Sequence, residues 1–266
     1  NNFLNKIFFI EICYFYSYIA FISYRVYLKF MSISINYKNS SDNKNSSNIV
    51  FFVDEKFNIS KLKKQISSSE YSFISDLLKT TDFNKKIVIF DFSSKKKFIL
   101  ISITKNTKSF EIENLGAKFY DTIKELAINN YQLNSDNSPN NIKNLVGHFL
   151  HGLMLKSYSF EKYKTKKSKK NITVFVTGKN KPSTGEQKKF KAIEEGSFYT
   201  RDLVSEPGNV LHPDEYAKRI NTLKKYGLKI TVYDEKKLKK LGMNTLLGVG
   251  QGSIRGSYLV TMEWNG

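Results

Sequence analysis

The sequence predicts an α/β fold, and two recurring patterns support this. Short apolar runs typical of buried strands recur along the chain, such as NIVFFV at Asn48–Val53 and KIVIFDF at Lys86–Phe92. Between them lie longer stretches whose apolar residues repeat every three or four positions, as on one face of a helix. Alternation of strands and helices along one chain is typical of a sheet covered by helices.

The same patterns predict the other elements of the first two thirds of the chain. They are strands at Phe98–Ile103 and Asn171–Thr177, helices at Glu111–Asn129 and Leu145–Met154, and a turn cluster at Asn134–Asn140. The lysine-rich segment Lys162–Lys170 is expected to be a solvated loop. Ser32–Asn48 is rich in Ser and Asn, so we expect mostly a polar loop, or the approach to a first strand, with no packed core of its own.

In the last third, KPSTG at Lys181–Gly185 indicates a hinge between domains. Pro213 suits a first helical position, and Gly227 suits a helix end. The expected elements are helices at about Glu186–Val204 and Pro213–Tyr226, a strand at Leu228–Tyr233, a short helix capped by Asp234 that ends at Gly242, and a strand at Tyr258–Trp264.

Composition excludes several classes of protein. The 266 residues are 40% hydrophobic and 25% charged, which excludes a chain disordered throughout. The single cysteine, Cys13, excludes a disulfide scaffold. The net charge of +19 is compatible with nucleic-acid binding. However, Lys supplies nearly all of the positive charge, whereas the guanidinium of Arg is the usual partner of phosphate. A Lys-, Asn- and Ile-rich composition also follows from AT-rich coding DNA, so no nucleic-acid partner is expected.

The first thirty residues contain an apolar run, Ile7–Tyr24, interrupted only by the charge of Glu11. Its length barely suits a membrane span. A secretory signal is disfavoured because no small-residue cleavage site follows. Residue 1 is Asn, and the sequence after Met31 looks like a cytosolic domain. We therefore favour translated upstream sequence with the native start at Met31, and a membrane anchor is the alternative.

Three groups of residues were considered as functional sites. His148 and His151 are spaced to share one helix face and one metal, but no third ligand with a matching context lies nearby. The glycines of Gly248–Gly252 suggest a phosphate loop, but a helix is expected before them and a strand after them, the wrong order for a dinucleotide site. A tight turn with positive φ is expected there instead.

The third group consists of acids and serines. Acidic residues gather on and after one predicted helix, at Glu194, Glu195, Asp202 and Glu206, and are interpreted as a helix face and its end. Ser205 and Ser253 lack the G-x-S-x-G context of a nucleophile. None of these groups forms a complete catalytic constellation.

From Thr200 onward, the sequence resembles the leucyl, or cytosol, aminopeptidase family. TRDLVSEPGNVLHPDEYA (Thr200–Ala217) is similar to the opening signature of that family's catalytic domain, and LKKLGMNTLLGVGQGS (Leu238–Ser253) and YLVTMEWNG (Tyr258–Gly266) continue in register. HGLMLKSYSFEKYKT (His151–Thr165) resembles the family's helix and loop late in its N-terminal domain. Ser205 and His212 stand where the family usually has Asn and Thr, and His is a weaker helix cap.

The resemblance implies a metal-dependent exopeptidase that releases N-terminal residues from peptides. It implies a cytoplasmic homo-hexamer that uses two divalent cations, Mn, Zn or Mg. It also implies an N-terminal α/β domain similar to macro domains. The expected division is a non-native or anchoring extension at 1–30, an N-terminal domain at 31–182, a linking helix at 183–203, and the start of the catalytic domain at 204–266.

The family's Lys-bearing glycine-rich turn and its N-T-D-A-E-G-R stretch do not occur in the sequence. We therefore expect no metal ligand and no catalytic residue among the 266 residues, and an inactive fragment of the enzyme. The alternative interpretation is a basic, macro-like module that binds nucleic acid or a nucleotide.

Overall fold

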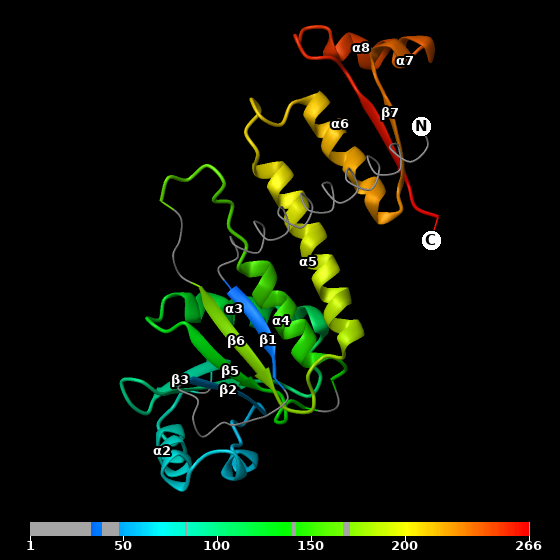
Figure 1. Cartoon of the computed structure of the whole chain (residues 1–266). Helices are drawn as coiled ribbons and strands as arrows, with labels where there is room; N and C mark the ends of the chain where they lie inside the picture. The colour runs from blue at the N-terminus through cyan, green and yellow to red at the C-terminus, as the bar shows by residue number, and fades with distance from the viewer. Residues whose placement is uncertain (1–32, 39–47, 83, 140–141, 167–170, 266) are drawn as a thin grey trace, which may run out of the picture. The chain divides into compact units, whose positions relative to one another are not determined.

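The computed structural model describes residues 33–38, 48–82, 84–139, 142–166 and 171–265 (Figure 1). The apolar run Ile7–Tyr24 and the expected start at Met31 lie outside the described residues. The described chain forms two compact units that divide between Phe198 and Tyr199. The α/β fold expected from the sequence is confirmed, since strands and helices alternate through both units.

The first unit is built on a six-stranded sheet with the order β1-β6-β5-β2-β4-β3. Neighbouring strands are parallel except β3, which runs antiparallel to β4. The strands are β1 (Ile33–Tyr37), β2 (Asn48–Val53), β3 (Ile87–Asp91), β4 (Lys97–Ser102), β5 (Asn130–Asn134) and β6 (Ile172–Thr177). The strands expected from the apolar runs are therefore confirmed within a residue at each end.

Helices cover both faces of this sheet, which explains why β2 is buried along its whole length and is apolar after Asn48. On one face, α3 (Ser109–Lys124) and α4 (Leu145–Lys156) bury Phe119 and Phe149. On the other face lie the 3₁₀ helix η1 (Ser60–Lys64) and α2 (Ser68–Leu78), which bury Leu62 and Ile74.

Two glycines allow α3 and α4 to touch. A Cβ on Gly116 would come 1.9 Å from the carbonyl oxygen of Phe149, and a Cβ on Gly152 would come 1.9 Å from that of Glu113. Backbone lies against backbone at both places, so no side-chain movement would make room. The short distance between the helices brings their polar residues near each other at the rim of the contact.

The structure corrects the expected elements in three places. Asn130–Asn134 is a strand at the centre of the sheet, and the helix expected over Glu111–Asn129 ends at Lys124. The expectation that Ser32–Asn48 lacks core contacts is wrong at its start, because Ile33–Tyr37 forms β1 and Ile33 is buried. Pairing with β6, distant in the sequence, stabilises this polar strand.

The helix α5 (Thr184–Ser205) contains the boundary between the two units. The second unit continues with α6 (Pro213–Asn221), η2 (Thr222–Tyr226), β7 (Lys229–Tyr233), α7 (Glu235–Lys240), α8 (Asn244–Gly250) and β8 (Leu259–Glu263). Strands β7 and β8 pair as an antiparallel ribbon. As expected, Pro213 opens α6, Gly227 ends η2 with a φ of 91°, and Asp234 caps α7.

The expectation of positive φ in Gly248–Gly252 is wrong. Among the described glycines, only Gly178, Gly227 and Gly242 have positive φ. Gly248 and Gly250 lie in α8, which the sequence analysis missed. Gly250 packs closely on a neighbouring loop instead, since a Cβ there would come 1.9 Å from the Ser257 hydroxyl, which would have to rotate away. Within the part of the chain that the structure describes, no helix combines the length and apolarity of a membrane span.

Candidate functional site

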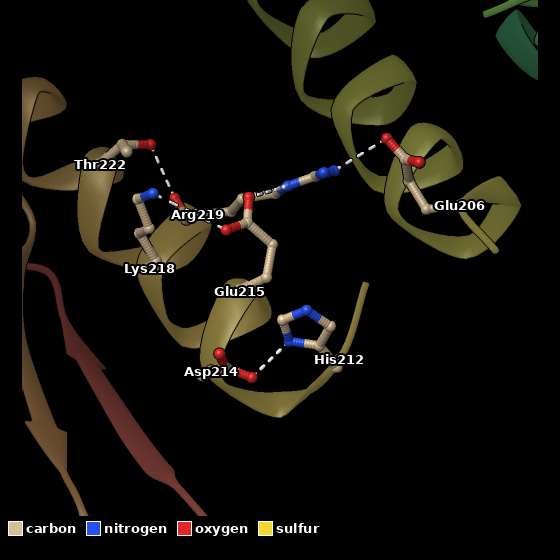
Figure 2. A network of polar contacts seen from close by, with 7 residues as sticks. All are labelled: Glu206, His212, Asp214, Glu215, Lys218, Arg219 and Thr222. Atoms are coloured by element: carbon tan, nitrogen blue, oxygen red, sulfur yellow. Dashed lines mark hydrogen bonds and ion pairs between the residues drawn. The ribbon is translucent and has the colours of Figure 1, made fainter. Parts of the chain in front are cut away.

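The second unit contains a network of charged side chains centred on Arg219 (Figure 2). From α6, the guanidinium donates through Nη1 to Glu206 Oε1 and through Nε to Glu215 Oε1, both at 3.0 Å. Glu206 follows the end of α5, and its side chain is only 2% exposed. The Thr222 hydroxyl donates to the Arg219 carbonyl oxygen over 2.7 Å. The network thus ties the turn after α5 to both ends of α6.

The network is charge-compensated. Burial would lower the pKa of Arg219, but the hydrogen bonds to Glu215 and Glu206 together raise it. The guanidinium is therefore a permanent cation held between two carboxylates. Lys218 lies 3.8 Å from Glu215 and is largely exposed, so it adds little.

The start of α6 is held by a second group of contacts. His212 occupies the N-cap position, and its side chain makes no capping hydrogen bond, as expected for His in place of Thr. Its Nδ1 instead contacts Asp214 in the first turn, where a carboxylate also interacts favourably with the helix dipole. Arg255 lies 3.6 Å from the same carboxylate, which connects the loop after α8 to α6.

The two histidines considered as metal ligands lie in the first unit and bind separate carboxylates. His148 Nδ1 lies 2.7 Å from Glu113 Oε1 on α3, and His151 Nδ1 lies 2.9 Å from Glu194 Oε1 on α5. Among the described residues, no group of three or more His, Cys, Asp or Glu is arranged to hold a metal ion. Each pair therefore joins two helices of the first unit.

The acids around α5 do not converge either. Glu194 pairs with His151, Glu195 lies 4.0 Å from Lys191, and Glu206 pairs with Arg219. The Ser253 hydroxyl accepts a hydrogen bond from the Arg255 backbone and so belongs to a turn. The sequence analysis missed Arg219, although Glu215 stands one helical turn before it, a spacing that favours an ion pair.

The carboxyl ends of β5 and β2 form the switch point of the sheet, where open α/β proteins usually bind ligands. Here Gln65 fills that position. Its side-chain amide donates to Asn137 Oδ1 over 2.8 Å and accepts from Asn134 Nδ2 over 3.1 Å. Beside it, Asp136 accepts from the backbone of Lys179 over 2.6 Å. Polar groups of the chain itself therefore satisfy Gln65 and Asn134 at this end of the sheet, whereas the buried Ser135 hydroxyl has no hydrogen-bond partner among the described residues.

Residues 198–266 match the family model described as "Cytosol aminopeptidase family, catalytic domain". A probable cytosol aminopeptidase of Phytoplasma mali is 45% identical over 128 residues, which are 46% of this chain and 26% of that protein. Its counterpart in Brucella melitensis is 44% identical over 126 residues, or 43% of this chain and 25% of that protein. The matches thus span about a quarter of the length of these relatives.

Two solved structures share the fold. A tomato leucine aminopeptidase variant has a TM-score of 0.70 and 17% identity, covering 86% of this chain and 50% of that chain. The bottromycin maturation enzyme BotP in complex with Mn has a TM-score of 0.62 and 14% identity, covering 82% of this chain and 45% of that chain.

The chain thus shares its α/β fold with the tomato enzyme, and residues 198–266 match the catalytic domain of a peptidase family. The resemblance that begins at Thr200 is confirmed: residues 198–266 belong to the catalytic domain of the cytosol aminopeptidase family.

Proposed function

We propose that this chain forms part of a leucyl aminopeptidase that releases N-terminal residues from peptides. The observation that carries the proposal is the match of residues 198–266 to the family's catalytic domain, in a segment whose turn is held by Arg219 and Glu206. The proposed enzyme is a cytoplasmic homo-hexamer. Its domains are those expected from the sequence: 31–182, the linking helix at 183–203, and 204–266.

The proposed enzyme uses two divalent cations, which polarise the peptide carbonyl and activate water when bound. The described residues do not fit such a centre. Their carboxylates near α5 and α6 are paired with Arg219, His151 and His212, and no group of three potential ligands is present among them. We therefore propose that the metal ligands lie outside these 266 residues, and that the 266 residues supply the scaffold.

A chimaera tests the proposal. The 266-residue chain is joined in register to the part of the Phytoplasma mali relative that follows the matched region. Hydrolysis of a leucine chromogenic amide is then measured with added Mn²⁺, before and after chelation. We expect metal-dependent turnover from the chimaera and none from the 266 residues or from the relative's segment alone.

Two results would contradict the proposal. One is a chimaera that folds and assembles like the relative but hydrolyses no peptide or amide. The other is chelator-sensitive turnover by the 266 residues alone that survives repurification, which would contradict the proposed location of the metal ligands.

A further inference from the structure

Within the first unit, Phe190 of α5 packs directly on the backbone of α4. A Cβ on Gly147 would come 2.5 Å from Phe190 Cε2, so the ring occupies the space that a side chain would need. The rings of His148 and His151 contact the same phenyl ring, with centroids 5.2 and 5.1 Å away. At this contact between α5 and α4, the phenyl ring of Phe190 therefore packs against two titratable imidazole rings.

Each histidine has its own carboxylate, but the two pairs differ in exposure. The side chains of His148 and Glu113 are 25% and 31% exposed, so water screens their charges. The side chains of His151 and Glu194 are 7% and 12% exposed. Only the second pair joins α4 to α5, and only there does a change of charge carry a large desolvation cost.

A buried His–carboxylate pair is most stable when its net charge is zero, which requires that it hold one titratable proton. Without that proton, a carboxylate stays buried against a neutral ring. With a second proton, an imidazolium stays buried against a neutral acid. Both states cost free energy relative to a solvated pair, and separation of the helices relieves that cost.

The titratable groups around the pair act on it in different directions. Tyr37 of β1 faces Glu194, and burial together with that carboxylate raises the pKa of Tyr37 to about 12, so the phenol stays neutral. Burial raises the pKa of Glu194, and the nearby charge of Glu195 raises it further. His151 and Lys191 act in the opposite direction, but the pKa remains raised. Glu186, at the start of α5, accepts from Asn144 Nδ2 over 2.6 Å, and its hydrogen bonds to Ser183 lower its pKa.

We propose that the His151–Glu194 pair is a proton-dependent lock that holds the first half of α5 on α4. The lock is closed while the pair holds one titratable proton. It opens when the pair loses that proton in alkali or gains a second one in acid. This makes the beginning of the long helix a conformational switch built into the first unit, and it does not depend on the proposed enzymatic function.

Hydrogen exchange of the whole chain tests the lock. Protection of residues 186–198 is measured from pH 5.5 to 9 and corrected for the intrinsic exchange rate, with β2 as the internal reference. We expect protection to pass through a maximum and to fall on both sides, by at most tenfold per pH unit because one proton is involved on each side. A flat profile, or loss of protection in β2 at the same pH, overturns the proposal.

Three variants separate the lock from simple packing. Glu194→Gln stays neutral and still accepts from the imidazole, so it is expected to remove the alkaline fall. Glu113→Gln changes the exposed pair and is expected to keep the wild-type profile. Gly147→Ala displaces Phe190 and is expected to lower protection at every pH without changing the shape of the profile. Equal profiles for Glu194→Gln and Glu113→Gln would overturn the proposal.

Discussion

The Arg219 guanidinium lies 3.0 Å from the carboxylate of Glu206, which is almost completely buried, while the arginine itself remains 23% exposed. This asymmetry matters because removing the cation takes a close opposite charge away from a buried carboxylate, which costs more free energy than losing an exposed ion pair. The Arg219 side chain is therefore expected to contribute strongly to the stability of the turn between α5 and α6.

We predict that Arg219→Ala destabilises the second unit by about 3 kcal/mol, the lower end of the range for a broken buried pair. Lys218→Ala is the matched control, because Lys218 is 80% exposed, and it is expected to change stability by less than about 0.5 kcal/mol. The protein has a single tryptophan, Trp264, so urea unfolding followed by its fluorescence reports on this unit. Equal midpoints for the two variants would contradict the prediction.

Gly116→Ala is expected to destabilise the first unit by about 3 kcal/mol, because the new methyl group would overlap the Phe149 carbonyl of α4. Gly196→Ala is the control, since nothing lies within 4 Å of the added Cβ on α5. It should stabilise its helix by up to about 1 kcal/mol. Thermal unfolding followed by circular dichroism distinguishes the two variants. If Gly116→Ala left the free energy of unfolding unchanged, the helices would not touch at Gly116.

Glu70 at the start of α2 makes stability depend on pH. Burial raises the pKa of its carboxyl, but Lys96 and Ser67 outweigh this and hold it below 4.5. The stabilisation is therefore present above pH 4.5 and is lost as the pH falls through the lower, folded-state pKa. We expect Glu70→Gln to cost about 1.5 kcal/mol at pH 7 and progressively less below pH 4.

Urea denaturation between pH 3 and 7 measures this difference. Asp76→Asn is a suitable control, because Asp76 and Lys79 form an exposed pair on the same helix and should contribute little at any pH. A constant difference between Glu70→Gln and the wild type across the range would exclude the acid-dependent contribution of Glu70.

The ribbon of β7 and β8 is expected to exchange its amide hydrogens faster than β2 and β4. It contains only two strands, and Met262 and Trp264 are 53% and 67% exposed, whereas β2 is buried throughout. Two-stranded ribbons are marginally stable without further packing. Hydrogen exchange of 228–233 and 258–264 as slow as that of 86–103 would show this prediction to be wrong.

The local sequence pattern was sufficient to predict the positions of strands and helices whose apolar residues recur with a clear period. NIVFFV predicted β2 at its observed ends, because a strand buried on both faces is a nearly continuous apolar run. Pro213, Gly227 and Asp234 marked helix ends, because their backbone and capping preferences act within a few residues. The motifs from Thr200 onward were sufficient to indicate the family, which the matched segment 198–266 confirmed.

Polar elements could not be recognised in this way. NYQLN looks like a loop, yet it forms β5 because β2 and β6 pair with its backbone on both sides. ISINY forms the edge strand β1 for the same reason. Their stability comes from hydrogen bonds to strands distant in the sequence, which local propensity does not report.

The sequence by itself determined the α/β class, most strand positions and the family, because each depends on short-range periodicity or on a contiguous motif. Only the tertiary structure decided the partners of the charged residues. His148 and His151 are neighbours on one helix, yet they pair with Glu113 and Glu194 on two different helices. The physical reason is that burial and pairing depend on which helices meet, and that is set by packing over the whole sheet, including the contact that Gly116 and Gly152 allow.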